Sequence, residues 1–206
     1  MKKTPYIKEQ LHELLYQALE TERGGIMIYE AALTCAQNED LKGEWEEYLE
    51  QTRTHEQVLL EVFEALALNP ETLTPGRKVV AHIGDSLVSA IEMAKAKGSA
   101  AAAQLVAAEC VVLAETKDHQ NWELIGHVAE HGRGEGVGAL RGAFESVAQE
   151  EDHHLYHTKG FTRELWIESL GLPAVLPPPE EVKKVETAIG AARAENLRDD
   201  MLKSKH

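Results

Sequence analysis

Apolar residues recur every three or four positions along most of this chain, which is the spacing that places them on one face of an α-helix. The pattern predicts helices over approximately residues 4–36, 39–68, 75–97, 99–130, 137–170 and 180–200. No stretch of the sequence alternates apolar and polar residues as a half-buried β-strand does. We therefore expect an all-α fold.

Capping residues indicate where these helices begin. Thr4 and Thr74 each precede a proline, which is the order of an N-cap and a first helical residue. Asn38 and Ser99 are suited to cap the second and fourth helices. The glycine-rich segment 131–138 does not follow a strand, so we interpret it as a flexible connection rather than a phosphate-binding loop.

A bundle of four long helices is the simplest architecture for this pattern. The helix at 75–97 would lie in a long central connection, which leaves room for the second and third bundle helices to run in the same direction. We assign residues 1–172 to the bundle and 173–206 to a C-terminal extension that begins near a stiff run of three prolines. The extension has only a thin apolar side, so we expect it to dock on the bundle or on another subunit, for example in a homodimer.

Composition narrows the class of protein. The 206 residues suffice for one domain, and a formal net charge of -14 makes nucleic acid an unlikely partner because phosphates would be repelled. The most apolar stretch, 105–114, is too short to span a membrane, and the N-terminus lacks the apolar core of a secretory signal. Two cysteines without a CxxC pair suit a reducing compartment, so we expect a cytoplasmic protein.

Glutamate and histidine interrupt the apolar stripe of each bundle helix near its middle. Burying such side chains without partners would cost many kcal/mol, whereas metal ions would neutralise the carboxylates and bind the imidazoles. Glu151 and His154 are three residues apart, so both can reach one ion. The candidate metal ligands are Glu22, His55, Glu115, His119, Glu151 and His154.

The last bundle helix offers two registers for this motif. Glu150 and His153 have the same spacing as Glu151 and His154. We prefer Glu151 and His154 because they are in register with the apolar residues of their helix.

With these residues the chain resembles the ferritin-like di-metal carboxylate superfamily, which includes ferritins, bacterioferritins, rubrerythrins and manganese catalases. The general pattern is a glutamate from each of two helices and Glu-x-x-His from each of the other two. The resemblance covers roughly residues 5–170. It is carried by Glu22 with Tyr29, Thr52-Arg-Thr-His55, Glu115 with Trp122, and Glu151-Asp-His-His154.

One position departs from the superfamily pattern. Thr52 stands where a second Glu-x-x-His motif would have its glutamate. Glu50 or Glu56 can take its place as a ligand from another position on the same helix. Alternatively, Asp118 or His119 of the next bundle helix can supply the missing ligand, or the protein binds only one ion tightly. The sequence leaves these alternatives open.

The resemblance implies a di-iron or di-manganese protein that acts on oxygen, peroxide or ferrous iron, or that oxidises an organic substrate. Electrons would come from an external donor, since no CxxC pair is present for a rubredoxin-type centre. Tyr29 would donate a hydrogen bond near the metals or trap a radical. Gly24 and Gly25 interrupt the first helix at a cost of roughly 2 kcal/mol, which indicates a close approach or open space for oxygen or substrate. The alternative is a metal-free helical bundle with a structural or interaction role.

Overall fold

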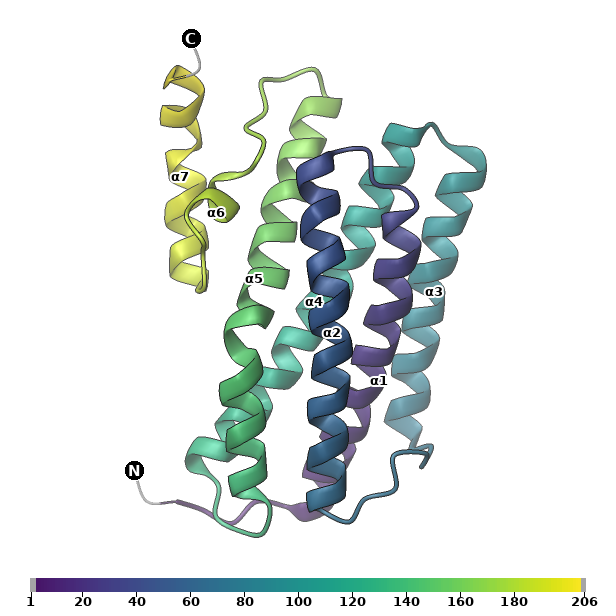
Figure 1. Cartoon of the computed structure of the whole chain (residues 1–206), viewed down its shortest axis with the longest axis vertical. Coiled ribbons are helices and arrows are strands. Elements are labelled where there is room, and N and C mark those ends of the chain that lie inside the picture. The colour runs from purple at the N-terminus through teal and green to yellow at the C-terminus, as the bar shows by residue number, and fades with distance from the viewer. Residues whose placement is uncertain (1–2, 205–206) are drawn as a thin grey trace.

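The computed structural model describes residues 3–204 and consists of helices joined by short connections (Figure 1). Within this range no strand occurs, and one isolated β-bridge joins Thr4 to Gly132. The all-α prediction is therefore confirmed. None of the described helices is both long and apolar enough to cross a membrane. The helices are α1 (Lys8–Leu33), α2 (Glu39–Ala65), α3 (Pro75–Lys97), α4 (Ala100–His131), α5 (Val137–Ser169), α6 (Pro179–Val182) and α7 (Ala188–Ser204).

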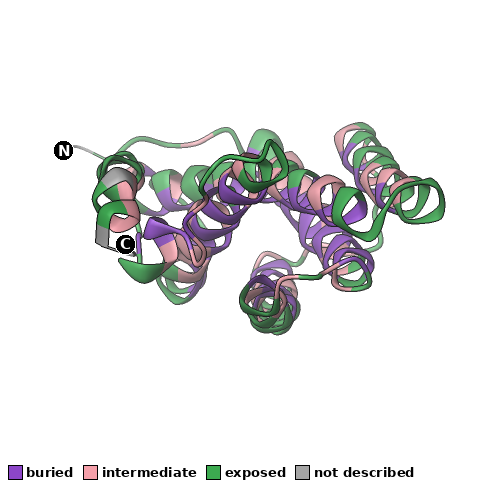
Figure 2. Cartoon of the chain, turned by 90° about the horizontal axis from the view of Figure 1, so that it is seen from above, coloured by how far each residue is buried: buried purple, intermediate pink, exposed green. Residues whose placement is uncertain are grey.

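Helices α1, α2, α4 and α5 form a four-membered bundle. Helix α1 packs against α2 and α4, and α5 packs against the same two helices from the other side. In Figure 1, α1, α3 and α5 rise while α2 and α4 descend, so the second and third bundle helices run in the same direction, which the long central connection allows. Helix α3 lies outside the bundle against α1 and α4, and the buried faces of the helices turn towards one another (Figure 2).

The apolar core consists of two separate clusters. One contains Leu15 and Leu19 of α1 with Leu59 and Phe63 of α2. The other contains residues from the opposite ends of the bundle helices, among them Ile28 of α1, Trp45 of α2 and Phe161 of α5. On each bundle helix, the segment between its two sets of core residues carries the candidate ligands. A polar layer therefore crosses the middle of the bundle and divides its core.

Helix starts follow the predicted capping residues except at the N-terminus. The side-chain oxygens of Asn38, Thr74 and Ser99 accept hydrogen bonds from backbone N–H groups three residues on, at 2.9 to 3.2 Å. The prediction for Thr4 was wrong, because α1 begins at Lys8. The Thr4 backbone instead pairs with the connection that follows α4, and local capping preference carries no information about such a distant partner.

The close approach predicted from the glycines of α1 occurs between α1 and α3. A Cβ atom added at Gly84 would lie 3.5 Å from the Cα atom of Gly24. On the other side of α1, a Cβ atom at Gly25 would lie 3.3 Å from Thr52 Cγ2. The glycines thus let α1 approach the backbone of α3 on one side and the Thr52 side chain of α2 on the other.

Helix α3 buries only a narrow face. Val80 and Ile91 are buried, whereas Val79, Ile83 and Met93 are more than half exposed. Because α3 packs beside α1 and α4 rather than within the bundle, only a thin strip of its surface is covered.

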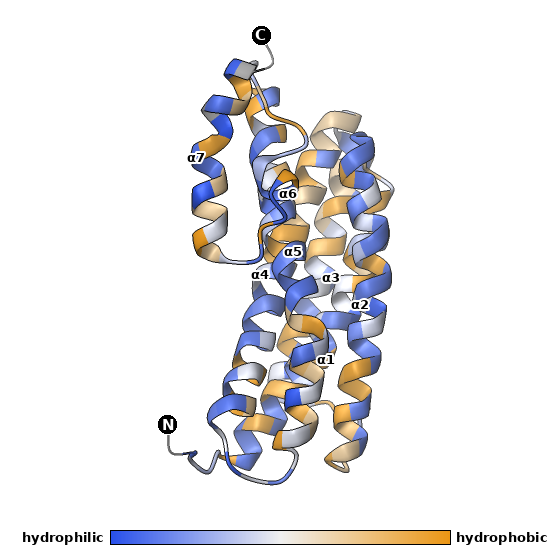
Figure 3. Cartoon of the chain, turned by 60° about the vertical axis from the view of Figure 1, so that its left-hand side comes forward, coloured by the Kyte–Doolittle hydropathy of each residue, from blue (hydrophilic) through white to orange (hydrophobic). Residues whose placement is uncertain are grey.

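The C-terminal extension docks on α5 as expected, but its structure differs from the prediction (Figure 3). The single helix expected over 180–200 is divided into α6 and α7. Val182 and Ile189 are exposed, whereas Val185 and Ala194 are buried.

Ion pairs around a buried carboxylate of α5 hold this extension. Glu164 is fully buried and accepts hydrogen bonds from Arg198 of α7 at 2.9 and 3.0 Å and from the Val175 backbone at 2.8 Å. Arg163 donates to Glu164 and, through two nitrogens, to Glu180 of α6 at 2.6 and 3.0 Å. Buried ion pairs therefore hold the extension together with the buried apolar side chains of Val185 and Ala194.

A Glu164→Ala variant is expected to release the extension, because it leaves two partly buried arginines without this carboxylate. The free energy of unfolding should fall by about 1–3 kcal/mol. Trypsin should also cleave faster at Lys183 and Lys184. The control is Glu168→Ala, since Glu168 is an exposed residue one turn further along α5. Equal cleavage rates in both variants would contradict this role of Glu164.

Candidate metal centre

Six acidic and imidazole side chains meet in the polar layer between the two apolar clusters. Each of them is no more than 4% exposed, which is unusual for ionisable groups. They come from all four bundle helices, so the layer depends on the assembled fold. We call this group the central site; it consists of Glu22 of α1, His55 of α2, Glu115 and Asp118 of α4, and Glu151 and His154 of α5.

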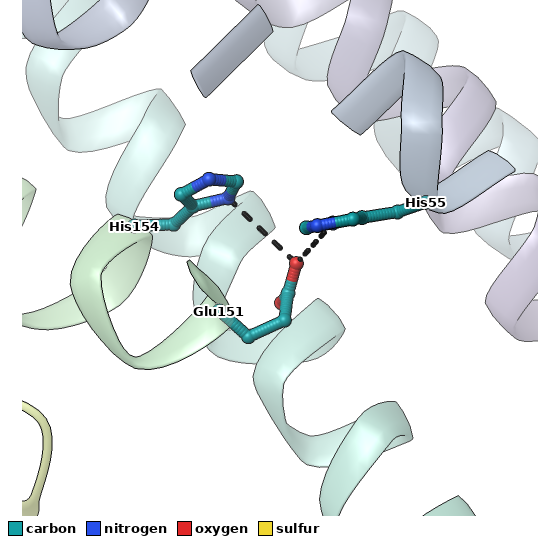
Figure 4. A group of neighbouring side chains, drawn as sticks. All are labelled: His55, Glu151 and His154. Carbon is teal, nitrogen blue, oxygen red and sulfur yellow. Dashed lines mark ion pairs between the residues drawn. The ribbon is translucent and has the colours of Figure 1, made fainter. Parts of the chain in front are cut away.

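Glu151 lies at the middle of the central site. Its Oε1 atom is 2.9 Å from His55 Nδ1 and 3.7 Å from His154 Nδ1 (Figure 4). His154 Nδ1 is also 3.6 Å from Glu115 Oε2, and His55 Nδ1 is 4.0 Å from Glu22 Oε1. Two imidazoles therefore face a shared set of carboxylates.

Two groups of possible ligands share Glu151. In the first group, Glu151 is joined by His55 and His154. In the second group, it is joined by Glu22 and Asp118. The ligand atoms within each group lie within 4.8 Å of one another. Each group could hold a metal ion, and Glu151 is the carboxylate that the two groups have in common.

Seven buried atoms of the central site have no hydrogen-bond partner among the described residues. Leaving buried polar atoms unpaired costs about 1–3 kcal/mol each, so native proteins contain few of them. Metal ions would supply a partner to carboxylate oxygens and imidazole nitrogens alike. The unpaired atoms are Glu22 Oε2, His55 Nδ1, Glu115 Oε2, Asp118 Oδ1, both Glu151 oxygens and His154 Nδ1.

Contacts behind the imidazoles orient them towards the centre. His55 Nε2 lies 2.7 Å from a Glu150 oxygen, and His154 Nε2 lies 2.8 Å from the Gln51 side-chain oxygen. Both oxygens can accept a hydrogen bond, and with the proton on Nε2 each ring presents the lone pair of its Nδ1 atom to the centre. Lone pairs facing carboxylate oxygens are unfavourable unless a proton or a cation lies between them. The arrangement is the one that metal-binding histidines have.

Burial and mutual repulsion make the carboxylates of the central site hard to ionise. Burial raises the pKa of Glu22 well above its usual range, and Asp118 and Glu151 raise it further. Burial followed by the charges of Glu151 and Glu115 does the same for the pKa of Asp118. Burial and Glu115 raise the pKa of Glu151 to about 8. Without a cation, this cluster therefore retains protons that exposed carboxyl groups would lose.

The structure brings five of the six predicted ligands together and leaves His119 at the edge. The His119 ring is partly exposed, and its nitrogens lie 3.6 Å from Asp152 and from Glu123. Asp118 takes the inward position on α4. The signal for Asp118 is its spacing, because Glu115 and Asp118 are three residues apart just as Glu151 and His154 are.

The geometry distinguishes between the alternatives for the missing glutamate at Thr52. Thr52 is buried and donates its hydroxyl to the Tyr48 carbonyl oxygen at 2.8 Å. Glu50 pairs with Arg53 on the surface, and Glu56 pairs with Arg23 at 2.8 Å. Neither glutamate belongs to the two ligand groups, whereas Asp118 does. The inward orientation of Glu151 and His154, preferred over Glu150 and His153, is confirmed by their burial.

A buried tyrosine and an apolar cavity lie near the central site. Tyr29 is buried with its ring 6.2 Å from that of His154, and burial followed by Glu115 raises its pKa well above the usual range. An apolar cavity of about 220 Å³ lies between α1, α3 and α4 and is lined by Gly24 among others. No residue of the central site lines this cavity.

Comparisons of the chain with protein-family models, with curated proteins and with solved structures found no match. The central site is therefore interpreted from its own residues.

Trp122 fixes the carboxylate of α1. Its indole N–H donates to Glu22 Oε1 at 2.7 Å, which leaves Oε2 as the unpaired oxygen. Trp122→Phe keeps most of the buried ring but removes this donor. Metal affinity should fall by about 10–100-fold, as is typical for residues that orient ligands. Trp166→Phe is the control, since Trp166 is 40% exposed and bonds to a surface glutamate. Titration with Mn²⁺ compares the variants, and equal affinities would contradict the role of Trp122.

Proposed function

We propose that this chain is a ferritin-like protein that binds two iron or manganese ions at the central site and acts on oxygen, peroxide or ferrous iron. The observation that carries the proposal is that the two buried ligand groups share Glu151, neither of whose oxygens makes a hydrogen bond among the described residues. The common direction of α2 and α4 also fits the superfamily resemblance, because a long central connection permits it.

The two positions differ in their ligands. His55, His154 and Glu115 would hold one ion, while Glu22 and Asp118 would hold the other, with Glu151 between them. The first position offers imidazole nitrogen, and the second offers only carboxylate oxygen. Asp118 takes the place of the predicted ligand His119 or of the glutamate missing at Thr52. The proposed second ion would therefore have fewer ligands than the first, and they would carry more negative charge.

Bound iron or manganese would supply redox chemistry towards oxygen species, and the protein's residues would control its surroundings. The two apolar clusters exclude water above and below the polar layer. Glu150, Gln51 and Trp122 hold their partners in one orientation. Tyr29 is protonated at neutral pH, as tyrosines ordinarily are, and burial raises its pKa further, so its hydroxyl can donate a hydrogen bond towards the site. Electrons for a complete cycle would come from a donor outside the chain.

Oxygen and peroxide consumption test this proposal. Protein loaded anaerobically with Fe²⁺ is mixed with oxygen, and protein loaded with Mn²⁺ is mixed with hydrogen peroxide. At least one should be consumed faster than by the same amount of free ion, because the buried carboxylates favour the oxidised, more highly charged ion. Glu151→Gln should remove the excess rate. The proposal fails if loaded protein and free ion react at equal rates in both assays.

A further inference from the structure

A second cluster of imidazoles and carboxylates lies outside the central site, where α2, α5 and α6 meet. It surrounds a cavity of about 220 Å³. We call this cavity the outer pocket; the residues used below are Glu44 and Tyr48 of α2, His153 and His157 of α5, and Glu181 and Lys184 from the C-terminal extension.

His157 presents an unpaired nitrogen to the outer pocket. The residue is 5% exposed, and its Nε2 atom is buried with no hydrogen-bond partner among the described residues. Its other nitrogen, Nδ1, lies 3.1 Å from the Tyr48 hydroxyl and 3.5 Å from a Glu44 oxygen. The ring is thus held from behind, and Nε2 is the nitrogen left for a ligand.

His153 supplies a second nitrogen one helical turn earlier. Its ring stacks on that of His157 with centroids 4.8 Å apart, as residues four apart on a helix permit. His153 Nε2 is also buried and makes no hydrogen bond among the described residues, although Glu186 Oε1 lies 3.5 Å away. Two neighbouring imidazoles with unpaired Nε2 atoms could supply two of the four ligands of a tetrahedral site for a divalent transition metal.

Carboxylates complete the surroundings of this histidine pair. Glu44 and Glu181 line the same cavity, and burial followed by the charge of Glu44 raises the pKa of Glu181. Lys184 also lines it and opposes a bound cation, but the acidic residues outnumber this single ammonium.

The outer pocket is distinct from the central site but close to it. The Tyr48 ring lies 4.3 Å from the ring of His154, while its hydroxyl contacts Glu44 and His157. None of the six residues of the central site lines the outer pocket. We propose that the outer pocket binds one divalent transition-metal ion through Nε2 of His153 and His157, with Glu181 as the oxygen ligand.

Co²⁺ binding tests this site independently of the central one. The visible absorption of bound Co²⁺ is titrated in a Glu151→Ala background, where the central site is disabled. About one equivalent should bind, because the outer pocket does not use Glu151. Adding His153→Ala and His157→Ala should weaken that binding by at least about tenfold, since both nitrogen ligands are lost. Circular dichroism and thermal melts verify that the variants are folded.

The chain contains a matched control pair. His127 and His131 are also four residues apart, with ring centroids 4.5 Å apart, but they lie on α4 away from the outer pocket. Replacing both with alanine in the Glu151→Ala background should leave the Co²⁺ equivalent in place. Loss of binding here, persistence of binding without His153 and His157, or no binding in the Glu151→Ala background would overturn the proposal.

Lys184→Gln separates a cation site from an anion site. Removing the ammonium should tighten Co²⁺ binding, and weaker binding would contradict a cation site. The central proposal can fail separately: wild-type protein would then bind only the equivalent that depends on His153 and His157.

Discussion

A Glu151→Ala variant is expected to lose the stabilisation that manganese or iron confers on the wild-type protein. Glu151 belongs to both ligand groups, so one substitution removes a ligand from each position. A ligand present at a hundred times its dissociation constant stabilises a fold by about 2.7 kcal/mol. For a chain of this size, the melting temperature should rise by roughly 5–10 °C with Mn²⁺ in the wild type and by about 1 °C or less in the variant.

Glu145→Ala is the control for this experiment. Glu145 is an exposed residue on the same helix, so its removal changes the net charge equally without touching the central site. Its melting temperature should rise with metal as in the wild type. If Glu151→Ala keeps the full rise, or if wild-type protein shows none, the central site does not bind metal as proposed and the metal-free alternative gains support.

The second large effect is expected in the metal-free protein. A triple variant Glu22→Gln, Asp118→Asn and Glu151→Gln should melt at a higher temperature than the wild type at pH 8 without metal. The wild type must bury carboxyl groups that tend to ionise, whereas the amides stay neutral. With metal the order should reverse, because the amides are poor ligands. If these residues only packed the core, the triple variant would differ from the wild type in the same direction with and without metal.

The same triple variant tests how the stability of the metal-free protein depends on pH. The pKa of Glu151 is raised to about 8 in the folded protein, so the folded state keeps a proton that the unfolded state loses near its ordinary pKa. The proton that Glu151 keeps therefore stabilises the folded state fully below that ordinary pKa, and this stabilisation is lost as the pH rises to about 8. The metal-free wild type should therefore melt on the order of 5–10 °C lower at pH 8 than at pH 5. The triple variant should show a clearly smaller difference, and equal differences would count against this cause.

Helical periodicity was sufficient to predict the bundle because each bundle helix has a strong local signal. The stripe of α5 placed Glu151 and His154 inward, and they are buried. The division of the core around Glu22 likewise follows from a charged residue within an apolar stripe. Such patterns depend only on helix geometry, which the sequence carries residue by residue.

Features that depend on distant partners could not be predicted in this way. Asp118 and His119 are neighbours on α4, and only the position of the adjacent helices decides which one faces inward. Thr4 has the local signature of an N-cap, yet its backbone pairs with residues near Gly132. The two-part C-terminal extension is held by Glu164, whose partners lie far along the chain.

Anomalous scattering from metal-loaded crystals tests the central claim most directly. Diffraction data collected at the iron and manganese absorption edges locate each ion independently of any assumed ligand. The account predicts two peaks, one on either side of the Glu151 carboxylate, with His55 and His154 at one and Glu22 and Asp118 at the other. An absence of peaks within bonding distance of Glu151, in crystals of protein reconstituted with either metal, would contradict it.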